Sequence, residues 1–156
     1  LYERLQKYEE IGDNMEVEIA QYLTKVSLSE LTMSASIRVR SMLTMIDNLE
    51  SIFDSCHNLG RSMKRKREQN AYFNQESREN LDRLYDKVEE ALKIMFDNLS
   101  NDYSENNLEK AKEAEKEINE LRNELKINNL KNIKEKEYKY KAGVIYNELF
   151  SELETM

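Results

Sequence analysis

The stretch MLTMIDNLESIFDSCHNLGRSM, residues 42–63, decides the fold class. Its apolar residues recur at alternating steps of three and four positions: Met42, Met45, Leu49, Ile52, Cys56, Leu59 and Met63. This spacing places them in one stripe along an α-helix. The pattern continues on both sides and predicts a long helix from about Ser34 to Asn70.

Four other stretches of the chain repeat this helical period. The first runs from the start of the chain to about Ser27. The others run from Gln75 to Leu99, from Leu108 to Leu125, and from Tyr138 to the end of the chain. Polar connections are predicted between the helices: Ser27–Ser36, Asn70–Asn74 with Asn74 as an N-cap, Ser100–Asn107, and a break or bend near Asn128 and Asn129.

The composition supports a fold without sheets. The chain has no proline and only 3 glycines, whereas sheet folds of this size use both residues in their turns. Charged residues make up 35% and hydrophobic residues 39%, a mixture typical of helices with one dry and one charged face. Because the turns between the helices are short, neighbouring helices are antiparallel. We therefore expect an all-α, up-and-down antiparallel helical bundle.

The charge balance and the cysteine count exclude several kinds of protein. The net charge of -7 argues against a nucleic-acid partner, because binding phosphates requires a basic surface. No apolar run approaches the roughly 18 residues of a membrane span. The single Cys56 cannot form an internal disulfide, which fits a reducing compartment. Helical patterns already run at Leu1 and still run at Met156, so we expect a piece of a longer protein.

Oxygen-bearing side chains flank the apolar stripe of the 34–70 helix. Glu50, Asp54 and Asn58 follow one another at steps of four and so line up along one face. A carboxylate held against an apolar face is costly unless it is neutral, paired or bound to a cation. A metal ion is one way to make such a row tolerable.

Acids occupy comparable positions on three other predicted helices: Glu9 and Asp13 on the first, followed by Glu16, then Glu115 on the fourth and Glu154 on the fifth. Carboxylates from neighbouring helices of a bundle hold metal ions. The sequence therefore predicts a divalent or trivalent ion (iron, zinc, manganese or magnesium) bound by Glu9, Asp13, Glu50, Asp54 and Asn58, with Glu115 and Glu154 as a partial second set. The alternative is that these acids face water or pair with Lys and Arg.

Two segments resemble the PhoU family. Residues 49–59, LESIFDSCHNL, are similar to its hallmark Glu-Arg-Ile-Gly-Asp with an Asn four residues later, although Ser51 and Phe53 replace the Arg and the Gly. Residues 8–17, YEEIGDNMEV, resemble the acidic helix that precedes the hallmark. The family is a tandem of three-helix repeats. The resemblance implies one repeat over 1–70, lacking its first helix, and a second over 71–156, with a truncated last helix, packed as one unit.

The resemblance also implies a function. Family members bind metal clusters through these acids and restrain phosphate uptake or signalling by contact with membrane partners. Residues 140–149, YKAGVIYNEL, are similar to the PhoU-like tails of bacterial sodium/phosphate cotransporters. The implied protein is a non-enzymatic regulatory domain on the cytoplasmic side of the bacterial inner membrane. Its implied partner is the transporter portion of the same polypeptide.

Other interpretations remain open. One is a free-standing PhoU-type regulator. Another is a purely structural helical module that forms a homodimer and binds no ligand. In the metal-binding interpretation, an isolated fragment could also lack the ion. The basic run Lys64, Arg65, Lys66 and Arg67 either contacts a membrane surface or is solvated near a helix C-terminus. Asp54 and His57 have the spacing of a di-iron enzyme ligand pair, but such enzymes need two pairs and this chain has one histidine.

Overall fold

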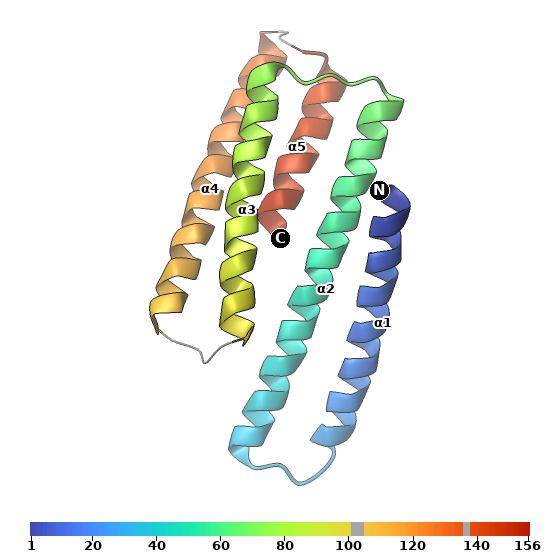
Figure 1. The fold of residues 1–156 in the computed structure, drawn as a ribbon, viewed down its shortest axis with the longest axis vertical. Coiled ribbons are helices and arrows are strands. Elements are labelled where there is room, and N and C mark those ends of the chain that lie inside the picture. Colours follow the sequence, from blue (N-terminus) through green and yellow to red (C-terminus); the bar gives the residue numbers. More distant parts are fainter. Residues whose placement is uncertain (101–104, 136–137) are drawn as a thin grey trace. The chain divides into compact units, whose positions relative to one another are not determined.

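The computed structural model describes residues 1–100, 105–135 and 138–156, without the side chains of residues 105–107. This described part contains five α-helices and no strand: α1 (Tyr2–Ser27), α2 (Met33–Glu68), α3 (Gln75–Ser100), α4 (Glu105–Lys134) and α5 (Tyr140–Thr155) (Figure 1). The predicted all-α helical bundle is confirmed. The middle of the predicted connection Ser100–Asn107 lies outside the described residues.

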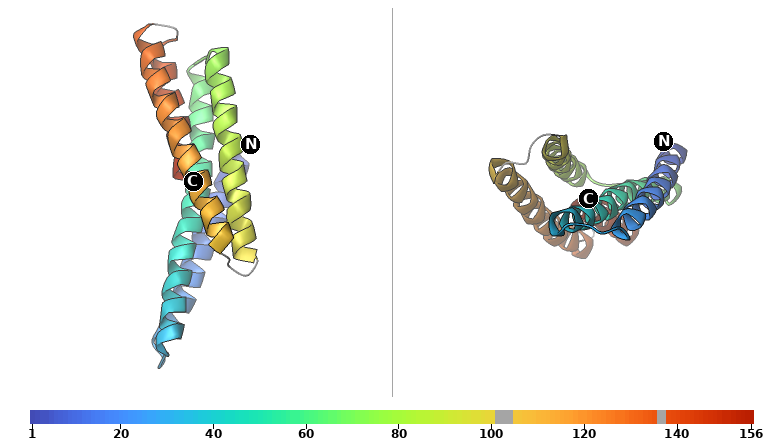
Figure 2. Two further views of the ribbon diagram at one scale, coloured as in Figure 1. Left: turned by 90° about the vertical axis from the view of Figure 1, so that its left-hand side faces the viewer. Right: turned by 90° about the horizontal axis from the view of Figure 1, so that it is seen from below.

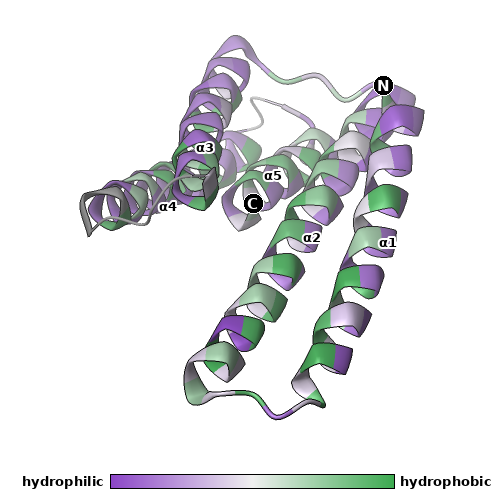
Figure 3. Ribbon diagram, turned by 60° about the horizontal axis from the view of Figure 1, so that its bottom comes forward, coloured by the Kyte–Doolittle hydropathy of each residue, from purple (hydrophilic) through white to green (hydrophobic). Residues whose placement is uncertain are grey.

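The chain divides into two compact units, Leu1–Arg61 and Ser62–Met156. The first unit is a hairpin of α1 and the first part of α2. Figure 3 shows hydrophobic residues on the sides of these two helices that face each other. The helices come close at Gly60, where an added Cβ would lie 2.6 Å from Cδ1 of Leu5.

The second unit holds the better-buried core. The last residues of α2 join α3, α4 and α5, and the latter three helices pack on one another (Figure 2). Its largest fully buried side chains are Tyr146, Phe150, Leu84, Leu125 and Ile145. The ring centroids of Phe73 and Tyr146 lie 5.4 Å apart, and those of Tyr146 and Phe150 also lie 5.4 Å apart, both pairs edge to face. Such aromatic pairs contribute beyond their buried area.

The connection between α2 and α3 contains a C-cap that ends α2 and an N-cap that begins α3. Asn70 adopts φ 47°, the left-handed conformation that Asn tolerates better than most residues. The N–H of Asn70 donates to the carbonyl of Arg67, and that of Ala71 donates to the carbonyl of Lys66. This pair of bonds is a Schellman C-cap. Oδ1 of Asn74 then accepts the N–H of Ser77 at 2.8 Å, which confirms the predicted N-cap.

The predicted break near Asn128 and Asn129 is wrong, because α4 continues without interruption to Lys134. Asn129 is 3% exposed. Its Nδ2 donates to the carbonyl of Gly143 at 3.0 Å, and its Oδ1 accepts a hydrogen bond from the Tyr138 hydroxyl. The polar residue is therefore the anchor between α4 and the α5 region. Satisfied hydrogen bonds make its burial in a helix tolerable.

The division at Arg61 and Ser62 reflects contacts within each unit and does not bear on internal repeats. The repeats inferred over 1–70 and 71–156 stay a prediction. Among the described residues, none of the helices combines the length and the apolar character needed to cross a bilayer.

Candidate metal centre

Three predicted ligands meet on the hairpin of α1 and α2. Glu9 and Asp13 lie one turn apart on α1, and Asp54 lies on α2. Each offers a carboxylate oxygen, and these oxygens all lie within 4.8 Å of one another. Glu9 is half-buried, whereas Asp13 and Asp54 are exposed. The group thus forms an open site at the surface of the hairpin.

Gly12 explains how the two helices come close enough for this meeting. A Cβ at Gly12 would lie 2.8 Å from Cδ2 and 3.3 Å from Cβ of Phe53. Only the absence of a side chain lets the backbone of α1 approach Phe53 at this level. The next residue in each helix is an acid of the group, Asp13 on α1 and Asp54 on α2. The close approach and the acid group therefore lie at the same level of the hairpin.

His57 holds one of the three carboxylates in place. Its Nδ1 lies 3.3 Å from Oε1 of Glu9, and its Nε2 lies 3.0 Å from the hydroxyl of Tyr2. His57 therefore contacts Glu9 at ion-pair distance with one ring nitrogen and is hydrogen-bonded to Tyr2 through the other. The rings of Tyr2 and His57 also contact each other, with centroids 5.5 Å apart. Neighbouring side chains of this kind orient the carboxylates that bind metal ions in proteins.

Glu50 stands beside the group in a less polar setting. It lines a pocket of about 240 Å³ whose other walls include Leu49, Phe53 and Glu16. Burial raises the pKa of Glu50, and the charges of Asp54, Glu16 and Asp13, with a hydrogen bond to Asp54, raise it further. The carboxylates at this level therefore repel one another. A cation bound among them relieves that repulsion.

The donor set fits a hard cation. Oxygens that share an ion bonded at about 2.0–2.6 Å lie about 3–5 Å apart, which matches the separations within the group. A site made only of carboxylates suits magnesium, manganese or a trivalent ion better than zinc, which also favours Cys and His. Exposed acidic groups of this kind also occur without an ion.

The remaining predicted ligands lie elsewhere. Asn58 is half-exposed, one turn after Asp54 on α2. Glu115 is exposed on α4, and Glu154 on α5 pairs with Arg122 at 2.9 Å. Within the part of the chain that the structure describes, no group of three close acids, histidines or cysteines contains Glu115 or Glu154. The partial second set stays a prediction.

The basic run at the end of α2 has contacts within its own unit. Arg65 pairs with Glu148 of α5, which also accepts a hydrogen bond from Ser62 at 3.1 Å. The ammonium group of Lys66 lies 4.8 Å from the centroid of the Phe73 ring. These contacts join the end of α2 to the core of the second unit. The membrane contact of this run stays a prediction.

Cys56 does not have the environment of a reactive thiol. It is half-buried in the hairpin, and burial raises the pKa of its thiol. A nucleophilic cysteine requires the opposite shift, toward the thiolate. The side chain is better explained as a packed thiol.

We expect Glu50→Gln to raise stability at neutral pH when a chelator is present. The raised pKa of Glu50 means that its protonated form favours folding. That contribution is complete below the ordinary pKa of a glutamate and is lost as the pH rises through the raised value. At pH 7 the variant should gain about 0.5 kcal/mol after allowance for solvent screening. Urea denaturation at pH 7 and pH 4 measures the difference between the variant and the parent.

The gain should shrink toward zero at pH 4, where Glu50 of the parent is largely protonated. The control is Glu18→Gln, which neutralises an exposed acid of α1. An equal gain of stability in the control would contradict the idea that neighbouring acids destabilise ionised Glu50. A gain at pH 4 as large as that at pH 7 would contradict it too.

No protein-family model, curated protein or solved structure matches this chain. The resemblance to the PhoU family therefore rests on sequence segments such as residues 8–17, 49–59 and 140–149, and none of the comparisons supports it.

Proposed function

We propose that this chain is a non-enzymatic interaction domain that binds a metal ion on its first helical hairpin. Glu9, Asp13 and Asp54 supply the ligands, with Glu50 and Asn58 close by on α2. The observation that supports this is the meeting of three carboxylates from two helices within 4.8 Å. Together with the resemblance to the PhoU family, it favours a regulatory role in phosphate uptake.

The ligands come from both helices of the hairpin, and this gives the ion a structural role. Charge neutralisation there removes the repulsion between α1 and α2 and fixes their register. A membrane partner then meets a hairpin surface of defined shape. In the favoured version, the partner is the transporter portion of a sodium-dependent phosphate cotransporter, and the domain lies on the cytoplasmic side of the bacterial inner membrane. A free-standing regulator differs from this version because the gene that encodes it specifies no membrane-spanning segments.

The metal requirement is tested by thermal unfolding of the full chain with Mn²⁺ and with a chelator. Saturating Mn²⁺ should raise the melting temperature by about 5–11 °C, because binding at 100 times Kd stabilises a protein by about 2.7 kcal/mol. The triple variant Glu9→Gln, Asp13→Asn, Asp54→Asn should show no such rise.

The matched control neutralises three exposed acids of the same unit, with Glu18→Gln, Glu30→Gln and Asp47→Asn. It removes the same charge and should keep the full response to Mn²⁺. The proposal fails if the triple variant responds as the parent does, or if the control loses the response as well.

A homodimerisation module is the second candidate. It is favoured by large apolar side chains that remain exposed on the hairpin: Met15 is 54% exposed, Tyr22 66% and Ile37 59%. Exposed apolar surface of this extent is typical of protein contacts. If this candidate is correct, light scattering should detect a dimer. Substitution of these residues should disrupt the dimer, and a chelator should not affect it.

A further inference from the structure

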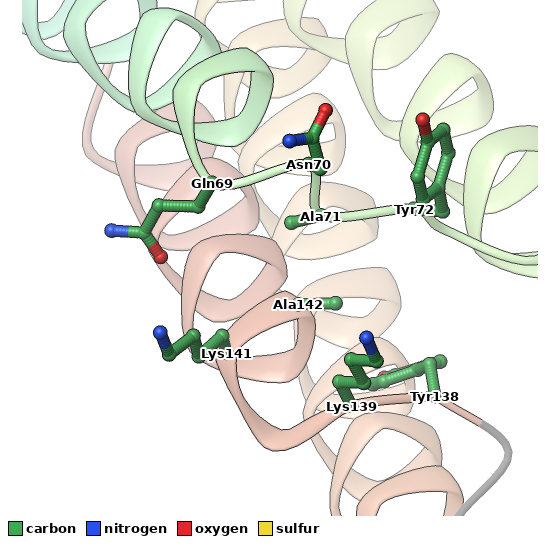
Figure 4. A pocket seen from close by; sticks show the side chains of 8 residues that line it. All are labelled: Gln69, Asn70, Ala71, Tyr72, Tyr138, Lys139, Lys141 and Ala142. Atoms are coloured by element: carbon green, nitrogen blue, oxygen red, sulfur yellow. The ribbon is translucent and has the colours of Figure 1, made fainter.

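A pocket of about 350 Å³ lies in the second unit, between the connection that follows α2 and the start of α5. Its volume falls in the range of about 300–1,000 Å³ that is usual for small-molecule sites. Figure 4 shows its lining in two rows that face each other. The lining residues are Gln69, Asn70, Ala71 and Tyr72 on one side and Tyr138, Lys139, Lys141 and Ala142 on the other.

The lining is positively charged in a chain that is acidic overall. Lys139 and Lys141 contribute two ammonium groups, none of the eight lining residues is acidic, and the net charge of the chain is -7. Within the described ranges, neither lysine forms an ion pair with a carboxylate. Burial raises the pKa of Tyr138, and the charge of Glu76 raises it further, but Glu76 does not line the pocket.

The other walls combine hydrogen-bond donors with apolar surface. Gln69 and Asn70 carry side-chain amides that donate hydrogen bonds. Ala71 and Ala142 are buried and form an apolar floor, and the ring of Tyr72 is 76% exposed at the edge. Lys139 is the N-cap of α5 and makes no capping bond with its side chain, so the first N–H groups of that helix add to the positive potential.

We propose that this pocket binds a small organic anion that carries a phosphate monoester and a flat apolar group. A phosphate monoester has a charge of about -1.5 to -2 near pH 7 and three acceptor oxygens, which matches two ammonium groups and neighbouring amides. The apolar group packs on Ala71 and Ala142. The pocket and the metal site on the hairpin lie in different units.

Isothermal titration calorimetry of the full chain with phenyl phosphate in low salt tests this proposal. We expect saturable binding, weaker binding of inorganic phosphate, and no binding of benzyl alcohol, which lacks the charge. Lys139→Gln and Lys141→Gln should each weaken phenyl phosphate binding about fivefold to tenfold, as expected for loss of one charged hydrogen bond. The control Lys110→Gln removes an exposed lysine of α4 and should leave the affinity unchanged.

A second variant tests the opposite wall. Asn70→Asp keeps the size of the side chain and tolerates the positive φ, but places a negative charge at the pocket. It should weaken binding at least as much as either lysine variant while its circular dichroism melt stays like that of the parent. The proposal is overturned if phenyl phosphate does not bind saturably, if benzyl alcohol binds equally well, or if Lys110→Gln weakens binding as much as the pocket variants.

Discussion

Replacing Phe150 by Ala should cost the second unit about 3–5 kcal/mol of stability, the usual range for emptying a buried aromatic site. Phe150 is 1% exposed and packs edge to face against Tyr146, which in turn packs against Phe73. The substitution removes one of these three packed aromatic side chains and leaves a cavity that the surrounding helices cannot fill. Because domains of this size are stable by only about 5–15 kcal/mol, the loss is a large fraction of the total. Urea denaturation followed by circular dichroism measures it.

Phe96→Ala is the matched control. Phe96 lies on α3 and is 67% exposed, so the same truncation should change stability by less than about 0.5 kcal/mol. Equal losses of stability at Phe150 and Phe96 would contradict the conclusion that Phe73, Tyr146 and Phe150 belong to the core of the second unit.

Asn129→Ala should cost about 1–3 kcal/mol, because it removes two buried hydrogen bonds at about 0.5–1.5 kcal/mol each. The carbonyl of Gly143 loses its side-chain donor, and the hydroxyl of Tyr138 loses an acceptor. Tyr138 is itself buried, at 9% exposure, so water does not freely replace the missing partner, although Asn132 and Ser77 still interact with its hydroxyl. Thermal and urea unfolding of the variant give the value.

The partner variant Tyr138→Phe separates the hydrogen bond from the packing. In a double-mutant cycle, the combined loss should be smaller than the sum of the single losses, because both changes remove one shared bond. Asn123→Ala, which removes an exposed amide of the same helix, should be nearly neutral. A simple sum in the cycle, or a loss at Asn123 like that at Asn129, contradicts the role of this amide.

The helices themselves follow from the sequence because each buries a stripe with a period near 3.6. The residues at their ends carry local chemistry that can also be recognised. Asn74 caps α3 through a bond to a residue three positions away, and no distant contact is needed to predict it.

The continuation of α4 could not be predicted in the same way. Asparagines favour turns when only local chemistry is considered, so Asn128 and Asn129 indicated a break. The amide of Asn129 instead finds its partners at Tyr138 and Gly143, across a connection whose geometry the sequence does not specify. Tertiary hydrogen bonds here outweigh a local preference.

The candidate site shows the same limit. The step of four residues predicted that Glu9 and Asp13 share one face of a helix. It could not predict the register of α1 against α2, which depends on the contact between Gly12 and Phe53. The ion-pair contact between His57 and Glu9 and the hydrogen bond between Tyr2 and His57 join residues far apart in the chain, and spacing gave no sign of them.

For Glu154, the spacing of residues in the sequence does not distinguish a metal ligand from a member of an ion pair. Its position beside the apolar stripe of α5 fits a metal ligand and an ion pair equally well. The structure places it 2.9 Å from Arg122 of α4. Arg122 carried no motif that would have marked it as the partner.

The central claim is that the carboxylates of Glu9, Asp13 and Asp54 hold a cation between α1 and α2. Equilibrium dialysis against Mn²⁺, followed by metal analysis of the retained protein, tests it most directly. The parent chain should retain about one ion, because the described residues form one such group. The triple variant Glu9→Gln, Asp13→Asn, Asp54→Asn should retain none. Equal retention by the parent and the triple variant would contradict the claim.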